Sequence, residues 1–120
     1  MVAGTTVAVD LGGTHVRSAL VADDGTVTGR LRRDTPRAAP TPAIVTEMIA
    51  EVVEQCRPWS RPDRVVVGVP GLVDHEAERL IHAPNLPAGW VGHLHHDWLS
   101  DRAGLPISMA NDADLAAVGE

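Results

Sequence analysis

The chain has 120 residues and a formal net charge of −6, which allows one domain with its own hydrophobic core and argues against nucleic acid as a partner. Its one cysteine excludes an internal disulfide framework and favours a reducing, cytoplasmic setting. We find no signal peptide and no apolar run long enough to span a membrane, so we predict no membrane partner.

The first third of the chain predicts three strands in a meander. An apolar strand over residues 5–10 is followed, after a glycine turn, by residues 15–22, in which polar and apolar side chains alternate at a period of two. The Asp-Gly pair at residues 24–25 is a favoured turn before a third strand over residues 26–34. Three arginines make that third strand a charged edge that discourages stray pairing, and a basic patch for nucleic acid is the alternative.

The turn between the first two strands combines an acidic residue, two glycines and a threonine. Gly12 and Gly13 can adopt positive φ and let a ligand approach the backbone, and the turn amides together with the Thr14 hydroxyl can converge on an anion. A carboxylate beside a phosphate requires a cation between the two, so Asp10 points to Mg²⁺ held through water. The alternative is an ordinary hairpin in which Asp10 accepts hydrogen bonds from its own turn amides.

A proline- and alanine-rich connector over residues 36–42 leads into a predicted helix. Thr41 is placed to cap that helix, with Pro42 at its first position and Pro58 at its end. Cys56 continues the apolar stripe of this helix, so we interpret it as a core residue and not as a nucleophile. The stripe consists of Ile44, Val45, Met48, Ile49, Val52, Val53 and Cys56.

Two candidate binding positions follow a near-continuous apolar strand over residues 63–69, which is typical of a strand covered on both faces. Pro70 fixes φ after that strand, and Gly71 lets the backbone come close to another group; a simple strand-ending turn is the alternative. Asn85 lies between two prolines in a stiff loop, where its amide can both donate to and accept from a sugar diol. Closure of an Asx turn is the alternative for Asn85.

A further helix is predicted to start within residues 89–97 and to end at residues 103–106. Three histidines fall within four residues near its start, but neighbouring histidines do not share a helix face, so we favour a solvated helix start over a metal site. The residues expected to face the core are Leu94, Trp98 and Leu99.

A short strand over residues 106–110 runs directly into Asn111 and Asp112, and the start of a new helix follows. A first helical turn favours the charged form of Asp112, and at the carboxyl end of a strand this carboxylate can act as a base toward a substrate hydroxyl. The alternative is a helix cap, and Asp114 is interpreted as a capping or solvated charge. Residues 110–120 begin a helix without ending it, so we expect the chain to be a fragment.

Four of these stretches occur in the order found in one family. They are Asp10-Leu11-Gly12-Gly13-Thr14, Gly68-Val69-Pro70-Gly71, Ala83-Pro84-Asn85-Leu86-Pro87, and the run from Asn111-Asp112-Ala113-Asp114 to Glu120. With them the chain resembles the glucokinase-like members of the ROK family of sugar kinases and repressors, in the actin, Hsp70 and hexokinase superfamily. The resemblance implies an α/β, RNase-H-like (actin-like ATPase) lobe: a mixed sheet whose first three strands form an antiparallel meander, with flanking helices. Residues 1–120 would be the N-terminal small lobe, and the C-terminal lobe would be absent.

The resemblance also implies a function, namely ATP-dependent phosphorylation of a hexose, such as glucose or an N-acetylhexosamine, by a cytoplasmic homo-oligomer in glycolysis and carbohydrate metabolism. Asp112 would be the general base, and Asp10 would orient Mg²⁺. The phosphates of ATP would be held by Gly12, Gly13 and Thr14, and the sugar by Gly71, Asn85, Asn111 and Asp112. His15 stands where the family often has lysine, and a neutral imidazole cannot replace a fixed cation. Other family motifs would lie beyond residue 120, so we expect this chain alone to be inactive.

Two other functions stay open within the same resemblance. One is a ROK-type, sugar-responsive transcriptional regulator, and the other is a sugar-sensing lobe without catalysis. Such regulators carry a DNA-binding winged helix before the lobe, whereas the predicted lobe starts within a few residues of Met1. They often lack the catalytic machinery too, whereas Asp112 is present. We therefore favour the kinase.

Overall fold

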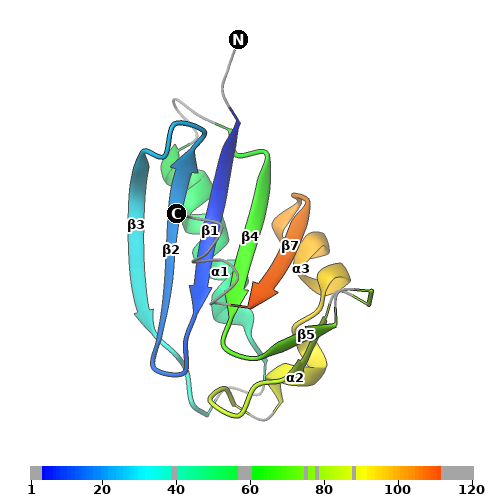
Figure 1. Cartoon of the computed structure of the whole chain (residues 1–120). Coiled ribbons are helices and arrows are strands. Elements are labelled where there is room, and N and C mark those ends of the chain that lie inside the picture. Colours follow the sequence, from blue (N-terminus) through cyan, green and yellow to red (C-terminus); the bar gives the residue numbers. More distant parts are fainter. Residues whose placement is uncertain are drawn as a thin grey trace.

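The computed structural model of the chain is built on a five-stranded mixed sheet with helices packed on it (Figure 1). The larger sheet has the strand order β3-β2-β1-β4-β7, and β5 pairs with β6 in a separate two-stranded sheet. Within the part of the chain that the structure describes, no helix combines the length and the apolar character that a membrane crossing requires. The described residues are 4–38, 41–56, 61–74, 76–77, 79–87 and 89–111.

The first third of the chain forms the predicted antiparallel meander. β1 (Thr5–Leu11) pairs with β2 (His15–Ala22), and β2 pairs with β3 (Val27–Asp34), in both cases antiparallel. At the turn between β2 and β3, Gly25 has a φ of 89°, a conformation that glycine adopts without steric cost. These strands follow the predicted boundaries to within one residue.

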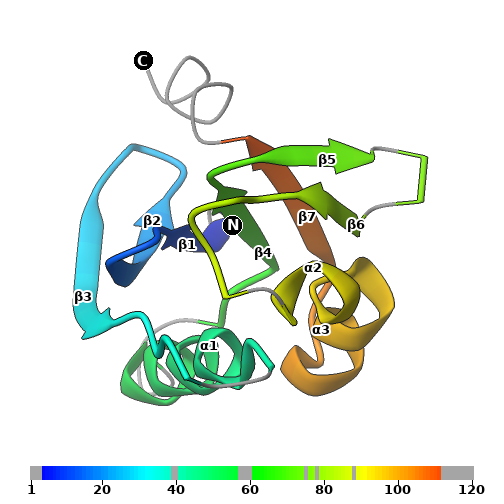
Figure 2. The ribbon, with the colours of Figure 1, turned by 90° about the horizontal axis from the view of Figure 1, so that it is seen from below.

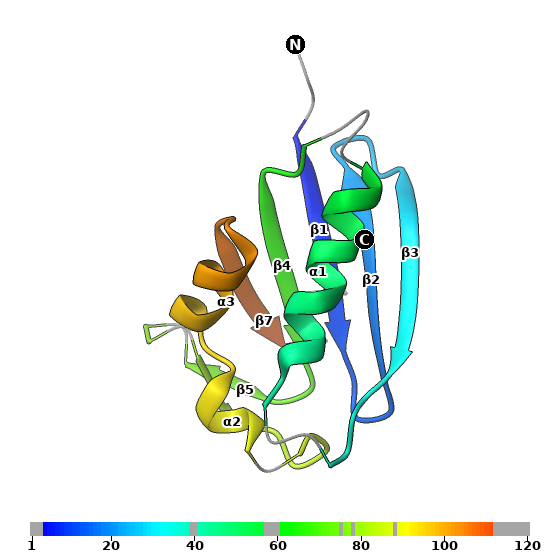
Figure 3. The same ribbon diagram turned by 180° about the vertical axis from the view of Figure 1, so that it is seen from behind.

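β4 (Arg64–Val69) and β7 (Ile107–Asn111) extend the sheet on the other side of β1 and run parallel to it. α1 (Ala43–Cys56) lies along one face of the sheet and connects the meander to β4 (Figure 3). Because β1, β4 and β7 point the same way, their carboxyl ends meet at one edge of the sheet. This mixed sheet with flanking helices confirms the predicted fold class.

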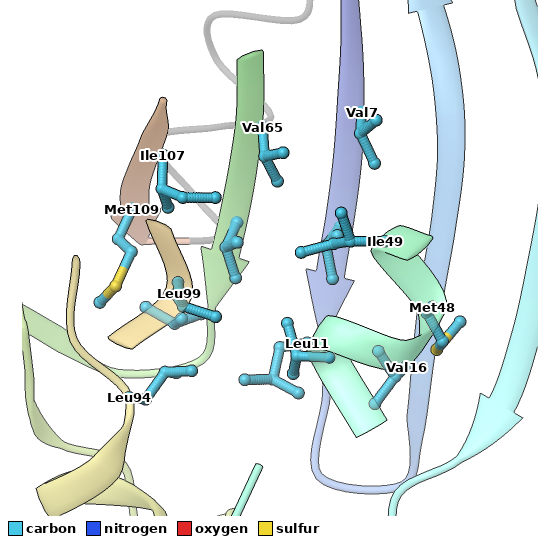
Figure 4. Close-up of a cluster of buried hydrophobic side chains, with 14 of the residues drawn as sticks. Val7, Leu11, Val16, Met48, Ile49, Val65, Leu94, Leu99, Ile107 and Met109 are labelled. Carbon is cyan, nitrogen blue, oxygen red and sulfur yellow. The ribbon is translucent and has the colours of Figure 1, made fainter. Parts of the chain in front are cut away.

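Alternation along the strands divides the sheet into a face packed against helices and an opposite face. Figure 2, which looks along the sheet, shows α1 and α3 on the same side of it. Val9 and Leu11 of β1 are fully buried, whereas Asp10 between them is exposed and lies on the opposite face. Burial of the apolar side chains is the main stabilising contribution to this lobe. Figure 4 shows members of the buried cluster, which includes Val7, Val9, Leu11, Val16, Val45, Met48, Ile49, Val52, Val65, Val67, Val69, Leu94, Leu99, Ile107 and Met109.

The helix predicted to start within residues 89–97 and to end at residues 103–106 is α3 (His96–Ala103), and a short helix that was not predicted, α2 (Trp90–His93), precedes it. α2 ends at Leu94, whose ψ of 87° is not helical, and α3 begins after an extended His95. The His95 ring accepts a hydrogen bond from the Trp98 amide at 3.3 Å and so caps α3. A capping side chain satisfies an amide that has no partner inside its own helix.

Two short strands, β5 (Leu72–Asp74) and β6 (Arg79–His82), pair with each other and were not predicted.

The core positions predicted for the region after these strands are confirmed. Leu94 and Leu99 are fully buried, and Trp98 is partly buried against the core.

The helix predicted after the connector is α1, which begins one residue later than predicted, at Ala43. Its apolar stripe faces the sheet as expected, with Val45 and Val52 fully buried. The surroundings of the Cys56 side chain and the end expected at Pro58 lie outside the described part of the chain, so these two interpretations stay predictions.

Candidate functional site

The glycine turn between β1 and β2 is held in place by hydrogen bonds from within the chain. The Gly12 amide donates to the His15 carbonyl at 2.9 Å and closes the hairpin. Thr35, just after β3, donates from its hydroxyl to the Gly12 carbonyl at 2.7 Å and from its amide to the Thr14 carbonyl at 2.8 Å. A strand, and not a helix, follows the turn, which confirms the predicted hairpin.

The two glycines of this turn allow close packing within the protein. They do so without the positive φ angles that were predicted for them. Neither Gly12 nor Gly13 adopts positive φ. A Cβ atom on Gly12 would lie 2.9 Å from the His15 carbonyl oxygen, and one on Gly13 would lie 2.7 Å from the Asn85 carbonyl oxygen. The missing side chains therefore let the turn fold tightly and let a distant loop contact it.

Asp10 is an exposed carboxylate near the end of β1, on the face of the sheet opposite α1. Its neighbours in register are Arg17 on β2 and Gly68 on β4, and Gly68 brings no side chain beside it. Among the described residues nothing donates a hydrogen bond to the Asp10 carboxylate, so the alternative in which turn amides bind it is not found there. Oxygen atoms without protein partners fit a hydrated Mg²⁺, which is held by few carboxylates and keeps several water ligands.

Gly71 and Asn111 contact each other at the same edge of the sheet, where β4 and β7 end. Asn111, the last residue of β7, donates from Nδ2 to the Gly71 carbonyl at 2.8 Å. Gly71 packs so closely on β6 that a Cβ atom there would overlap the carbonyl oxygen of His82. Asn111 lies beside the buried Val69 in register, so strand alternation places it on the opposite face from Asp10.

The Asn85 loop lies against the glycine turn. The Asn85 side chain is exposed and makes no hydrogen bond within the described residues, so an Asx turn is not found in that part of the chain. Its backbone carbonyl accepts a hydrogen bond from Arg37 Nη1 at 2.8 Å, and the same nitrogen donates to the Gly13 carbonyl at 2.7 Å. A cavity of about 760 Å³ lies between the turn and the loop, lined by Gly13, Thr14, Asp34, Thr35, Arg37, Pro84 and Asn85.

Asp112, the predicted base, lies outside the described residues, so its position stays a prediction. The structure does place its chain neighbour Asn111 at the edge that carries Asp10. Asp10 and Ala110 both pair with Gly68, so they occupy one row across β1, β4 and β7. At about 4.8 Å per strand, the backbones at these two ends of the row are about 10 Å apart.

The described histidines do not gather into a metal site. No group of three or more His, Cys, Asp or Glu residues that could hold a metal occurs in the described ranges. His95 caps α3, as noted above. His15, directly after the glycine turn, places Nε2 2.9 Å from Arg32 Nη2 and 3.5 Å from Asp34 Oδ1. The side chain directly after the glycine turn is thus engaged with its neighbours on β3.

The sequence analysis missed two residues that bind the glycine turn, Thr35 and Arg37, which together donate three hydrogen bonds to it. Both residues lie between the third predicted strand and the predicted helix, where no periodic pattern marks them. Their hydrogen-bond acceptors are backbone carbonyls, which every residue carries. The residue type at the acceptor therefore gives no sign of these contacts in the sequence.

Comparison with known proteins gives one family and a consistent set of relatives. A family model described as "ROK family" matches residues 6–120. The glucokinase of Streptomyces coelicolor is 32% identical over 117 residues, which cover 98% of this chain and 35% of that protein. The N-acetylmannosamine kinase of Citrobacter koseri is 34% identical over 125 residues, which cover 97% of this chain and 39% of that protein. The chain therefore spans little more than a third of the length of these relatives.

Solved structures agree with the sequence comparison. The ROK family glucokinase from Streptomyces griseus, crystallised with glucose and AMPPNP, superposes with a TM-score of 0.77 at 30% identity, covering 95% of this chain and 35% of that one. A ROK family transcriptional regulator homologous to the E. coli MLC protein superposes with a TM-score of 0.73 at 20% identity, covering 97% of this chain and 30% of that one. The second likeness shows the fold alone.

Proposed function

The chain belongs to the ROK family, and from this premise we propose that it is the small lobe of an ATP-dependent hexose kinase. Sugar kinases among its relatives support the proposal, and one of them was crystallised with glucose and AMPPNP. Because this chain corresponds to 35% of the Streptomyces coelicolor glucokinase, the proposed active protein includes a second lobe. We propose that it is cytoplasmic and homo-oligomeric, and that its acceptor is glucose or an N-acetylhexosamine.

The proposal rests on two exposed polar side chains that lie beside the glycine turn at the carboxyl edge of the sheet. Asp10 and Asn85 flank the glycine turn in space, and neither side chain has a hydrogen-bond partner among the described residues. Asn111 ends β7 at the same edge. Phosphoryl transfer depends on positioning and charge neutralisation, and an edge of this kind offers groups for both.

In this proposal the residues of the site divide into two groups. The turn from Gly12 to Thr14 holds the phosphates of ATP, and Asp10 holds hydrated Mg²⁺, which when bound neutralises phosphate charge. The loops that carry Gly71, Asn85 and Asn111 hold the sugar, and Asp112 accepts the proton of its attacking hydroxyl.

The test is an assay of ADP release by the two-lobe protein over a panel of hexoses, with and without Mg²⁺. We expect ADP release that requires both the sugar and Mg²⁺, with glucose or an N-acetylhexosamine as the best substrate. Residues 1–120 alone should release none, because they span only part of the proposed site. A two-lobe protein that binds a hexose in a titration but releases no ADP with any of them would contradict the proposal and favour a sugar-sensing lobe.

A further inference from the structure

Arg37 lies in the connector after β3, and its guanidinium joins two loops that are distant in the sequence. Nη1 donates to the Gly13 carbonyl at 2.7 Å and to the Asn85 carbonyl at 2.8 Å. The first carbonyl belongs to the proposed nucleotide turn, and the second belongs to the proposed sugar loop. Each amino nitrogen of a guanidinium carries two N–H groups in a fixed plane, so both N–H groups of Nη1 are used and the separation of the two carbonyls is set.

The two loops also touch each other directly beside this guanidinium. A Cβ atom on Gly13 would lie 2.7 Å from the carbonyl oxygen of Asn85 and 3.0 Å from its Cβ. Two carbonyl oxygens directed at one cation repel each other when no donor stands between them. The close contact of the turn and the loop therefore depends on the donor that Arg37 supplies.

The glycine turn is fixed from its other side as well. Thr35, two residues before Arg37, donates to the carbonyls of Gly12 and Thr14. The segment that follows β3 thus binds three successive carbonyls of the turn and one carbonyl of the Asn85 loop. Of these two residues, Arg37 is the one that reaches both loops.

We propose that Arg37 is a positioning residue that couples the nucleotide turn to the sugar loop. Because one cation holds both loops, a displacement of either loop moves the hydrogen bond on which the other depends. The expected effect on catalysis rests on the proposed function, whereas the effect on the two loops does not.

The kinetic test compares Arg37→Met with Arg64→Met in the two-lobe protein. Methionine keeps much of the length of arginine but has no N–H group. Arg64 is exposed at the amino end of β4, away from the glycine turn. Its replacement removes the same charge and leaves intact the two hydrogen bonds from Arg37 to Gly13 and Asn85, which we call the clamp. We expect Arg37→Met to raise the KM for ATP and the KM for the sugar by about tenfold each, and Arg64→Met to change neither by more than about twofold. Arg37→Lys, which keeps donors, should recover most of the loss.

Hydrogen exchange without ligands tests the clamp independently of kinase activity. Two reporter amides are Gly12, which donates to the His15 carbonyl, and Leu86, which donates to the Ala83 carbonyl. Arg37→Met should accelerate exchange at both by about tenfold, and Arg64→Met at neither. If Arg37→Met does not fold, Arg37→Lys should show a smaller acceleration at the same two amides.

The outcomes distinguish the coupling of the two loops by Arg37 from the proposed kinase function. Acceleration confined to one loop, or absent from both, would overturn the coupling, as would a KM change for one substrate alone. Acceleration at both loops in a protein that releases no ADP would uphold the clamp and remove the proposed kinase function.

Discussion

Asp10 and Asn111 are polar residues near the ends of two parallel strands at one edge of the sheet, yet the protein uses them differently. The Asp10 carboxylate is exposed and has no hydrogen-bond partner among the described residues. The Asn111 amide is partly buried and donates to the Gly71 carbonyl at 2.8 Å. The first side chain is open to solvent, and the second fixes a backbone turn. Similar motif positions in the sequence thus separate into an exposed carboxylate at the end of β1 and a structurally engaged amide at the end of β7.

The largest effect is expected just beyond β7, at Asp112. In the two-lobe protein, Asp112→Ala should lower kcat by about 10²–10⁴-fold, because a positioned base is lost, while the sugar still binds in a titration. Asp112→Asn keeps the size of the side chain and should lose turnover to a similar degree. Either variant with substantial turnover would refute the role of Asp112 as the base.

At the β1 end the expected effect is on the nucleotide. Asp10→Ala should raise the KM for Mg-ATP by about 10–100-fold, the usual cost of removing a residue that holds a metal through water. The affinity for the sugar, measured by titration without nucleotide, should stay close to that of the wild type. Loss of sugar affinity of the same size would show that Asp10 does not act on the nucleotide alone.

The β7 end can be disturbed through Gly71 without changing a polar side chain. Gly71→Ala should destabilise the protein by about 1–3 kcal/mol, because its methyl group would overlap the His82 carbonyl oxygen. Gly92→Ala is the matched control, since a Cβ atom there meets nothing within 4 Å. We expect the control to be neutral or slightly stabilising in thermal unfolding. Equal stability of the two variants would show that the close packing of Gly71 carries no cost.

The smallest effect is expected for the side chain that fixes this turn. Asn111→Ala removes the donor to the Gly71 carbonyl and should lower the free energy of unfolding by about 1 kcal/mol. Asn111→Asp should cost at least as much, because a carboxylate cannot donate and would face the carbonyl oxygen. Denaturant unfolding of the three proteins measures the difference, and an aspartate variant as stable as the wild type would argue against the hydrogen bond.

The sequence predicts the parts of the fold that carry regular patterns. β2 alternates between polar and apolar side chains, and the apolar stripe of α1 repeats at helical spacing. The sequence therefore predicts both ends of β2, and it predicts the start of α1 to within one residue. β5 and β6 have three and four residues, too few to show a period, and Leu72 and Ile81 are exposed at 59% and 46%. Those two strands could not be distinguished from loop.

The site was predicted unevenly for a physical reason. Motifs place Asp10, Asn85 and Asn111 at the ends of strands or in a loop. The structure brings Asp10 and Asn85 beside the glycine turn, and it places Asn111 at the same edge but on the opposite face of the sheet. The contacts of Arg37 could not be predicted, because the carbonyls of Gly13 and Asn85 lie 24 and 48 residues away and bear no signature of their own. Only the tertiary fold brings those three positions together.

The most direct test of the division between the two strand ends is the dependence of the initial rate on free Mg²⁺ in wild-type and Asp10→Ala two-lobe protein, measured at saturating sugar. We expect the variant to require a clearly higher Mg²⁺ concentration for half its maximal rate. The same Mg²⁺ dependence in both proteins would contradict this expectation.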